Sequence, residues 1–297
     1  MCLNGGLTVN IQPLVSVLMV TRNRPHHLAA SLTAVLSQSL QGGVELCVVN
    51  DGGEKLPGLQ WWVQNAVATR GWTVRWLDLP YSNGQVAARN QALALATGEF
   101  VAWCDDDDRW LPQRLDQCIA VYRRSVEKKS LALVYTDTEL VTLRRNFGNW
   151  RVSDRQNFAW TQAKELLERT NPVVPSSWLY RREAHQKVGY FDESVGHYWD
   201  WDFLLRMTHL GEFARVAACL TLYGVDAEGS NASAQPSMMR ADLERLVAKH
   251  GLPDLPSSNF SLMLQDPELA KWRANTRRVW DGTPDIWNDI RDEENGG

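Results

Sequence analysis

Four consecutive aspartates at positions 105–108 directly follow the apolar run FVAWC at 100–104. Neighbouring carboxylates repel one another and raise one another's pKa, so stability alone gives no reason to group them. Residues two apart in an extended chain project to the same side, about 6.5–7 Å apart, so Asp105 and Asp107 could share one cation. Mg²⁺ and Mn²⁺ sites commonly combine one or two carboxylates with phosphate oxygens and water. The cluster therefore predicts a divalent-metal site that holds a phosphorylated substrate.

Two other interpretations of the aspartate cluster compete with a metal site. Most runs of charge are solvated loops, but this one adjoins a strand that the pattern predicts to be buried. An EF-hand calcium loop needs acidic residues, a glycine and a terminal glutamate at set spacings, and the sequence lacks that pattern.

The first half of the chain alternates strand and helix patterns. Apolar or alternating runs predict strands at 14–20, 44–51, 72–79, 99–105 and 131–140, and helical periodicity falls at 24–39, 84–98 and 112–128. Alternation of this kind predicts an α/β fold with a mainly parallel sheet that is covered on both faces. Polar residues at the carboxyl ends of such strands line the ligand crevice, and Asn50, Asp51 and the aspartate cluster fall there.

The pattern changes after about residue 156. Residues 156–224 read as helices, at 157–170 and 201–211, joined by irregular segments. The basic and aromatic stretch 144–156 is interpreted as a solvated loop, with contact to a phosphorylated acceptor or lipid headgroups as the alternative. A stretch rich in Gly, Ser, Ala and Asn at 224–237 predicts a linker, and two helices are expected beyond it, at 238–251 and 267–280.

Composition narrows the class of protein. The 297 residues carry a formal net charge of -4, which argues against a general nucleic-acid binder. Five scattered cysteines without a C-x-x-C pair are expected to be reduced thiols. No apolar run is long enough to span a bilayer, and the N-terminus lacks a signal-peptide pattern. We therefore expect a soluble cytoplasmic chain, with peripheral contact at the inner face of a membrane left open.

Five segments of the chain belong together. In chain order they are VSVLMVTRNRP, LCVVNDGG, SNGQVAARNQALALATGEFVAWCDDDDRWLP, VGYFDESVG and WDWDFLLRM. These segments together resemble family 2 glycosyltransferases, over about residues 14–225. The family has the GT-A fold, a mainly parallel Rossmann-like sheet flanked by helices. The resemblance implies a nucleotide-sugar donor, a divalent cation (Mn²⁺ or Mg²⁺) and transfer with inversion to a carbohydrate or glycoconjugate acceptor.

The resemblance also implies a division of the chain. Residues 1–225 would form the glycosyltransferase domain, with a nucleotide-sugar-binding half at 14–140 and an acceptor half at 156–225. Residues 226–297 would form a linker and a C-terminal helical extension.

For the donor, the resemblance assigns residues at four places. Asp51 would contact the nucleotide base, although the family more often has two acids there and this chain has Asn50 first. Thr21 and Arg24 would line the base and ribose, and Arg89 would approach the diphosphate. UDP-sugars are the favoured donors, with dTDP- and GDP-sugars left open.

The family's D-x-D element matches Asp105 and Asp107, and Asp108 completes the longer D-x-D-D pattern. The metal is assigned to Asp107 and Asp108, and Asp105 and Asp106 are placed with the donor-binding residues. Asp106 stands where the family usually has a small apolar residue, so we expect its charge to be solvated.

The segment WDWDFLLRM matches the family's catalytic-base motif at Asp200. A carboxylate there can take the proton of the attacking acceptor hydroxyl. Trp199 and Trp201 flank Asp200 and could stack on an acceptor sugar, although most tryptophans serve packing. For Asp202, a structural role in the first turn of a helix is at least as good an interpretation.

One departure from the family concerns the diphosphate. Relatives often carry an Arg and a His after a tyrosine, where this chain has Gly224 and Asp226. Asp226 is either an extra metal ligand, or this loop has lost the role of holding the metal or the diphosphate. Two alternatives to a transferase remain: a sugar nucleotidyltransferase, which would want glycine after the first strand, and a non-catalytic sugar- or nucleotide-binding module.

Overall fold

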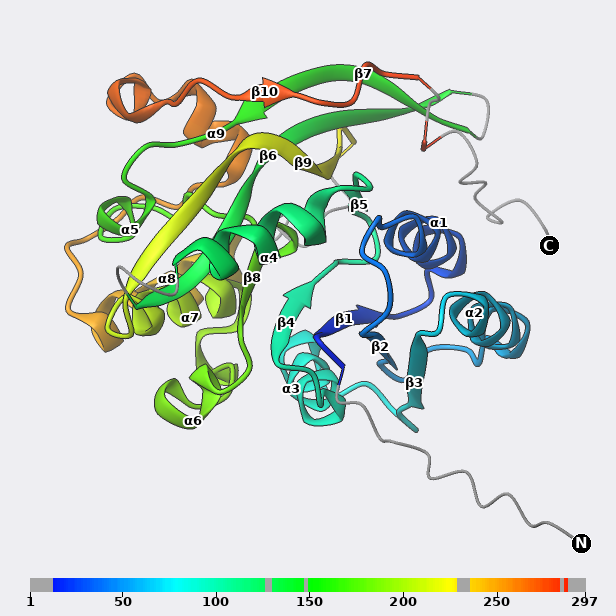
Figure 1. Ribbon diagram of the computed structural model, residues 1–297. Helices are drawn as coiled ribbons and strands as arrows, with labels where there is room; N and C mark the ends of the chain where they lie inside the picture. The colour runs from blue at the N-terminus through cyan, green and yellow to red at the C-terminus, as the bar shows by residue number, and fades with distance from the viewer. Residues whose placement is uncertain (1–12, 126–129, 147–148, 229–235, 284–285, 288–297) are drawn as a thin grey trace, which may run out of the picture.

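The computed structural model describes residues 13–125, 130–146, 149–228, 236–283 and 286–287. Their central feature is one twisted sheet in the order β10-β9-β6-β8-β4-β1-β2-β3, with helices on both faces (Figure 1). In this part of the chain, no helix is long and apolar enough to cross a membrane. The α/β class expected from the sequence is confirmed, whereas the cytoplasmic location and the membrane contact stay predictions.

The amino-terminal half follows the predicted alternation. β1 (Val15–Thr21), β2 (Val44–Asn50), β3 (Thr73–Asp78) and β4 (Phe100–Trp103) pair in parallel. α1 (Pro25–Leu36) turns Leu28, Leu32 and Val35 into the core, as its periodicity predicts. α2 (Pro57–Thr69) was not predicted, because only Val63 and Val67 on it are buried. α1, α2 and α4 (Arg114–Ser125) cover one face of the sheet, and α3 (Gln85–Leu95) covers the other.

The carboxyl-terminal half of the sheet corrects the sequence interpretation. Residues 156–225 contain strands as well as helices: β8 (Trp178–Arg181) runs antiparallel between β4 and β6 (Leu131–Asn146), and β9 (Glu212–Asp226) runs parallel to β6. The stretch 144–156 is not a loop, because β6 continues through Arg144 and Arg145 and forms a hairpin with β7 (Asn149–Phe158). A half-exposed hairpin tolerates polar residues on its outer face, which hid it in the sequence. The sheet is therefore mixed, and β5 (Arg109–Trp110) adds an antiparallel pairing to β9.

Helix predictions in this half are confirmed in part. α7 (Trp199–Met207) and α8 (Pro236–His250) form where expected. The prediction at 157–170 is wrong except for α5 (Ala163–Leu166), and that at 267–280 is wrong, since this segment holds only a 3₁₀ turn (Ala270–Trp272) and β10 (Arg277–Arg278). The remaining short elements are η1 (Pro175–Ser177), α6 (Ala184–Val188), η2 (Glu193–Tyr198) and α9 (Phe260–Gln265). Part of the predicted linker lies outside the described residues.

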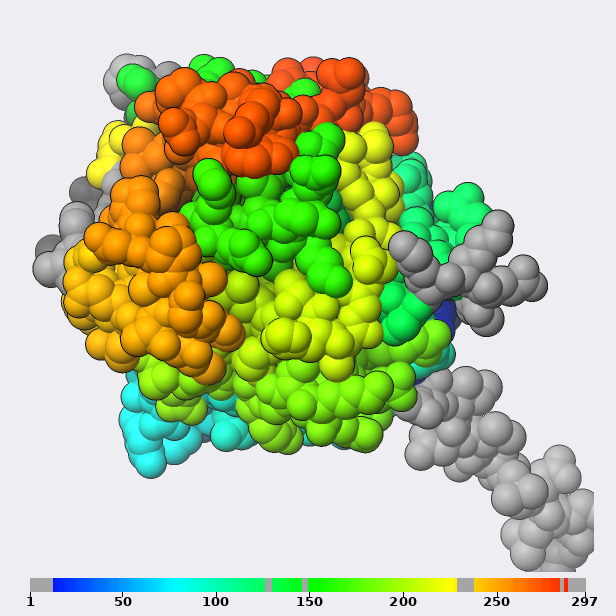
Figure 2. Space-filling model, turned by 90° about the vertical axis from the view of Figure 1, so that its left-hand side faces the viewer, coloured from blue at the N-terminus to red at the C-terminus, as the bar shows by residue number. Residues whose placement is uncertain are grey.

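The residues after position 225 contribute to the same cores as the residues before it. Leu243 and Leu246 of α8 are buried against α7 and its neighbours, and Trp280 joins the cluster on the opposite face. Figure 2 shows the C-terminal segment, orange to red, lying across the green and yellow middle of the chain. A domain boundary near residue 225 stays a prediction, but this segment packs as part of the described fold.

Leu246→Ala tests that packing. The side chain of Leu246 is fully buried, so its truncation should lower the free energy of unfolding by about 2–5 kcal/mol. Leu262→Ala on α9 is the matched control, because Leu262 is 49% exposed and should cost far less. Urea denaturation of both variants measures the difference. Equal, small losses would show that α8 contributes little to the fold.

Candidate active site

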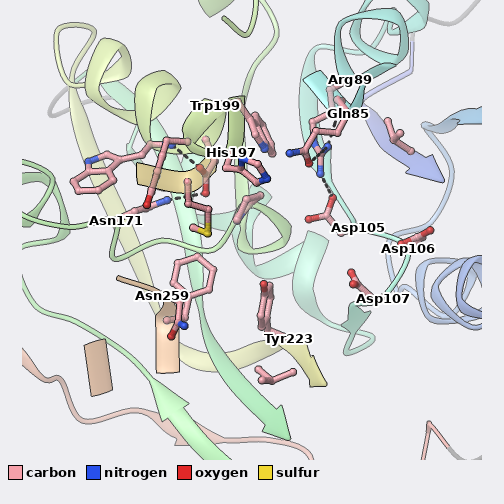
Figure 3. A pocket seen from close by; sticks show the side chains of 18 of the residues that line it. Gln85, Arg89, Asp105, Asp106, Asp107, Asn171, His197, Trp199, Tyr223 and Asn259 are labelled. Atoms are coloured by element: carbon pink, nitrogen blue, oxygen red, sulfur yellow. Dashed lines mark hydrogen bonds and ion pairs between the residues drawn. The ribbon is translucent and has the colours of Figure 1, made fainter. Parts of the chain in front are cut away.

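A cleft of about 660 Å³ opens at the carboxyl ends of β1, β2 and β4 and extends to α7 and the C-terminal segment (Figure 3). It brings together most of the residues that the sequence singled out. Those that line it are Thr21, Arg24, Asp51, Arg89, Asp105, Asp106, Asp107, Trp199, Asp200 and Trp201. Asp108 is not among the lining residues.

Asp51 is held at the end of β2 by a neighbouring loop. Its carboxylate accepts hydrogen bonds from Ser82 Oγ at 2.6 Å and from the Asn83 backbone N–H at 3.0 Å. Gly52, the next residue after Asp51, has a φ of +68°, and a Cβ on it would come within 2.2 Å of the backbone nitrogen of Ser82. The close approach of the two loops therefore requires glycine. The side-chain amide of Asn50 donates to the Glu54 carbonyl at 2.8 Å, so it shapes the loop.

Three aspartates of the cluster are bound by residues of other elements. Asp105 accepts from Arg89 at 2.8 Å, and Asp107 accepts from Arg24 at 3.0 Å. Asp106 accepts from Thr21 Oγ1 at 2.7 Å and from Arg24 at 2.8 Å. The expectation of a solvated Asp106 is wrong: the residue is only 5% exposed, because these two partners turn it inward.

Burial and charge act differently on these carboxylates. Burial raises the pKa of Asp106 to about 7, although Arg24 opposes the shift and the charge of Asp107 adds to it. Burial also disfavours the charged form of Asp107, but the charge and hydrogen bond of Arg24 outweigh it and lower that pKa. Burial raises the pKa of Asp105 against the opposing charge of Arg89. Among Asp105, Asp106 and Asp107, the pKa is therefore lowered only at Asp107.

Asp108 lies apart from the cleft and ties the metal-motif loop to β9. It is fully buried, and its Oδ1 accepts a hydrogen bond from the backbone N–H of Gly224 at 3.3 Å. Burial, followed by the charges of Asp107 and Asp105, raises its pKa well above the usual value. This placement favours a structural role for Asp108, and the metal role that the resemblance implies stays a prediction.

The cleft residues fit a cation that arrives together with a diphosphate. Asp105 and Asp107 both line the cleft, and Mg²⁺ or Mn²⁺ commonly uses one or two carboxylates with phosphate oxygens. Within the described part of the chain, no three His, Cys, Asp or Glu side chains cluster as a preformed cage. A cation held by Asp105 and Asp107 would need further oxygen ligands, which phosphates and water commonly supply.

Asp200 stands in the first turn of α7 and lines the same cleft as Asp105, Asp106 and Asp107. One carboxylate oxygen accepts from Asn171 Nδ2 at 2.8 Å, and the other accepts from the Trp201 backbone N–H at 2.8 Å. Burial raises its pKa to about 7; the charge of Asp105 adds to the shift, and that of Arg89 opposes it. A carboxylate with a pKa near neutrality is suited to take a proton at working pH.

The neighbours of Asp200 serve packing first. Trp199 packs edge-on against Trp103 and Trp178, and the guanidinium of Arg89 lies 4.4 Å from its ring centre. The indole N–H of Trp201 donates to the Leu167 carbonyl at 2.8 Å. Both tryptophans border the cleft although they are about 95% buried, so stacking on an acceptor stays a prediction.

Asp202 has the structural role that the sequence left open. It is fully buried and pairs with Arg206 at 2.6 Å, with Lys249 at 2.6 Å and with His250 at 2.8 Å. Lys249 and His250 belong to α8, so Asp202 fastens this helix to α7.

Several lining residues were not found in the sequence. Asn171 precedes η1 in a stretch without periodicity, and its contact with Asp200 spans 29 residues. His197 lines the cleft together with Asp226. The others come mainly from β9 and the C-terminal segment: Tyr223, Met239, Asn259, Phe260 and Met263. Only a run of polar and aromatic residues at 257–261 could have drawn attention to the last group.

Similarity to solved structures is extensive although sequence identity is low. TarS 1–349 of Staphylococcus aureus in complex with UDP-GlcNAc has a TM-score of 0.56 at 17% identity, covering 79% of this chain and 66% of that one. The mannosyltransferase PcManGT of Pyrobaculum calidifontis, in complex with GDP-Man and Mn²⁺, has a TM-score of 0.56 at 14% identity, covering 82% and 67%. The chain spans about two thirds of the length of these structures, and the likeness shows a shared GT-A fold.

Sequence similarity shows the family. Residues 16–189 match the model of glycosyl transferase family 2. The chain is 34% identical over 272 residues to the uncharacterized glycosyltransferase YwdF of Bacillus subtilis, covering 91% of this chain and 96% of that protein. It is 30% identical over 128 residues to the UDP-Glc:alpha-D-GlcNAc-diphosphoundecaprenol beta-1,3-glucosyltransferase WfgD of Escherichia coli, covering 43% and 47%. From the family match and the relative that is similar along nearly its whole length, we conclude that the chain belongs to glycosyl transferase family 2.

Proposed function

We propose that this protein transfers a sugar with inversion from a nucleotide-sugar donor to an acceptor hydroxyl, with Asp200 as the general base. The observation that carries the proposal is the position of Asp200: a buried carboxylate, poised near neutral pKa, that shares one cleft with Asp105 and Asp107. Family membership supports transferase activity.

In the proposed reaction, the acceptor oxygen forms a bond to the anomeric carbon as the bond from that carbon to the diphosphate breaks. The acceptor proton passes to Asp200, and the nucleoside diphosphate leaves with the bonding electrons. Asn171 and the Trp201 backbone N–H hold the carboxylate in place. A single displacement of this kind needs one base and no covalent intermediate on the protein.

The leaving group would be held on the other side of the cleft. Asp105 and Asp107 would hold Mn²⁺ or Mg²⁺, which when bound neutralises charge that develops on the diphosphate. Arg89 and Arg24 border the same side and add positive charge there. Asp51, fixed at the end of β2, is placed to contact the base.

UDP-sugars are the favoured donors. The TarS fragment is titled as a complex with UDP-GlcNAc and PcManGT as one with GDP-Man and Mn²⁺, which supports a nucleotide sugar but leaves the base open. Two observations argue against the alternatives. A non-catalytic binding module has no need of a buried base such as Asp200, and a sugar nucleotidyltransferase would want glycine after β1, where this chain has none.

Asp200→Asn tests the base. The amide keeps the size of the side chain but cannot take the proton, so steady-state transfer should fall roughly 10²–10⁴-fold. Affinity for UDP with Mn²⁺, measured by calorimetry, should persist, because Asp51, Asp105 and Asp107 come from other elements. Asp192→Asn is the control, since Asp192 precedes the same helix but pairs with Lys249 outside the cleft lining. Near-normal transfer by Asp200→Asn would remove this residue from the chemistry.

The pH dependence follows from the same carboxylate. Because Asp200 must be ionised to act, kcat/KM should rise with pH through about 7. Asn171→Ala removes a donor that stabilises the charged form, so this acidic limb should move to higher pH. Thr161→Ala, at an exposed position, should leave the limb in place. A limb that does not respond to Asn171→Ala would assign the ionisation to another group.

The ionisation of Asp200 should also make the stability of the protein fall as pH rises, whereas kcat/KM rises. The folded-state pKa of Asp200, about 7, lies above the usual value of about 4 for an unfolded chain, so the wild type loses stability as pH rises between these values. Asp200→Asn does not bear that penalty and should gain in thermal stability relative to the wild type from pH 4 to pH 8. A constant difference across this range would show that burial of Asp200 does not disfavour its charge.

Asp107→Asn tests the cation site. UDP and Mn²⁺ together should raise the melting temperature of the wild type, because ligands that bind only the folded state stabilise it. The Mn²⁺-dependent part of that shift should vanish in Asp107→Asn and remain in Asp154→Asn, an exposed position on β7. Asp108→Ala should lower the melting temperature without ligand but keep the Mn²⁺ effect, because it removes the acceptor of the Gly224 N–H. An unchanged Mn²⁺ effect in Asp107→Asn would refute the assignment.

A further inference from the structure

The backbone of the aspartate cluster is held by two buried side chains that do not line the cleft. Ser31 Oγ, on α1, lies 2.6 Å from the Asp106 carbonyl oxygen and 2.8 Å from that of Asp108, so its proton can be donated to either. Arg109 Nη1 donates to Ser31 Oγ at 2.6 Å and to the Asp108 carbonyl at 2.8 Å. Both side chains are fully buried. The course of the backbone from Asp106 to Asp108 therefore depends on Arg109 and Ser31.

Arg109 is a buried cation with few polar contacts of its own. Within the described part of the chain, its Nε and Nη2 have no hydrogen-bond partner. Burial lowers its pKa to about 10, against the charges of neighbouring groups that include Asp107 and Asp108, so the guanidinium stays protonated at neutral pH. It lies over the ring of Trp287, 5.5 Å from the ring centre, which is within the range of a cation–π contact. This contact is a means of holding the guanidinium in place.

Trp287 lies where the metal-motif loop meets β9. It is fully buried in the core cluster on that face of the sheet. A Cβ at Gly224 would come within 2.9 Å of the Asp107 carbonyl oxygen and 3.6 Å from Trp287 Nε1, so the absence of a side chain there lets β9 approach both. The Gly224 N–H donates to Asp108 Oδ1 at 3.3 Å. A residue from the far end of the chain is thus in contact with the surroundings of the proposed cation site.

We propose that Trp287 is a positioning residue for the cation site: it holds Arg109 against Ser31 and the backbone of the aspartate cluster. This inference rests on the proposed function, because it concerns the cation that Asp107 would bind. A loop that is fixed beforehand has less conformational freedom to lose when a ligand binds, so its affinity is higher. Loss of the indole would free the guanidinium to leave the Asp108 carbonyl, and the cation would then have to order the loop.

Calorimetric titration of Mn²⁺ into the full chain saturated with UDP tests the inference. Trp287→Ala should weaken Mn²⁺ binding at least fivefold, although Trp287 is not a metal ligand. Trp287→Phe keeps an aromatic ring for Arg109 and should stay within twofold of the wild type. A smaller change in Trp287→Ala, or no recovery in Trp287→Phe, would overturn the inference. Wild-type protein that binds no Mn²⁺ with UDP, GDP or dTDP would instead refute the proposed function, and the role of Trp287 with it.

Trp72→Ala is the matched control for lost stability. Trp72 is also buried in the same core cluster and carries an arginine, Arg70, 4.2 Å from its ring centre, but it belongs to the connection between α2 and β3. Urea denaturation should show that both alanine variants are less stable, and only Trp287→Ala should bind Mn²⁺ more weakly. Equal weakening in Trp72→Ala would assign the effect to stability and contradict the inference.

A second pair of variants serves if Trp287→Ala does not fold. Ser31→Ala removes the hydroxyl that joins Arg109 to the aspartate backbone and should weaken Mn²⁺ binding at least threefold. Ser37→Ala, at an exposed position just after the same helix, should leave it unchanged. The same Mn²⁺ affinity in both serine variants would show that the contacts of Arg109 do not position the site.

Discussion

The pairing of cleft carboxylates with arginines from other elements is the constraint on which the site depends. Arg24 of the β1–α1 connection binds Asp106 and Asp107, and Arg89 of α3 binds Asp105. Without these partners, the burial of adjacent carboxylates would be prohibitively unfavourable. The arginines thus allow the aspartate cluster to stand at the end of β4, where the proposed cation and diphosphate would bind.

Asp200 differs from the aspartate cluster in its hydrogen-bond partners. Asp200 is buried, whereas Asp105 and Asp107 are partly exposed. It accepts hydrogen bonds from the Asn171 amide and the Trp201 backbone N–H, and no arginine of the described residues forms a salt bridge with it. Burial raises its pKa to about 7, although the Trp201 N–H and the charge of Arg89 oppose the shift. Two kinds of carboxylate therefore face one cleft, one neutralised by arginine and one kept basic, which suits a reaction with a charged donor and a hydroxyl acceptor.

The C-terminal segment contacts the elements that carry Asp200 and His197. Through Asp202, Lys249 and His250 it fastens α8 to the helix that carries Asp200, and through Asp242 it orients His197. The buried leucines of α8 and the aromatic packing of Phe260 join this part of the cleft lining to the core. A segment that the sequence pattern presents as an appendage is thereby in contact with both α7 and the cleft.

Patterns that depend only on near neighbours in the chain were readable from the sequence. The apolar runs of β1, β2 and β4, the periodicity of α1, α7 and α8, and the family motifs containing Asp107 and Asp200 all lie within short windows, and the structure places these two aspartates at one cleft. Contacts between distant segments were not readable. The burial of Asp106 by Thr21, the diversion of Asp108 to Gly224, the hold of Asn171 on Asp200 and that of Asp242 on His197 join residues 29–116 positions apart. The hairpin of β6 and β7 was also missed, because its polar residues do not form an apolar pattern and the segment is a strand only through its pairing with β6. Local periodicity shows which face of a helix or strand is apolar. The hydrogen-bond partner of a buried polar group depends instead on which distant segments pack beside it in the folded sheet.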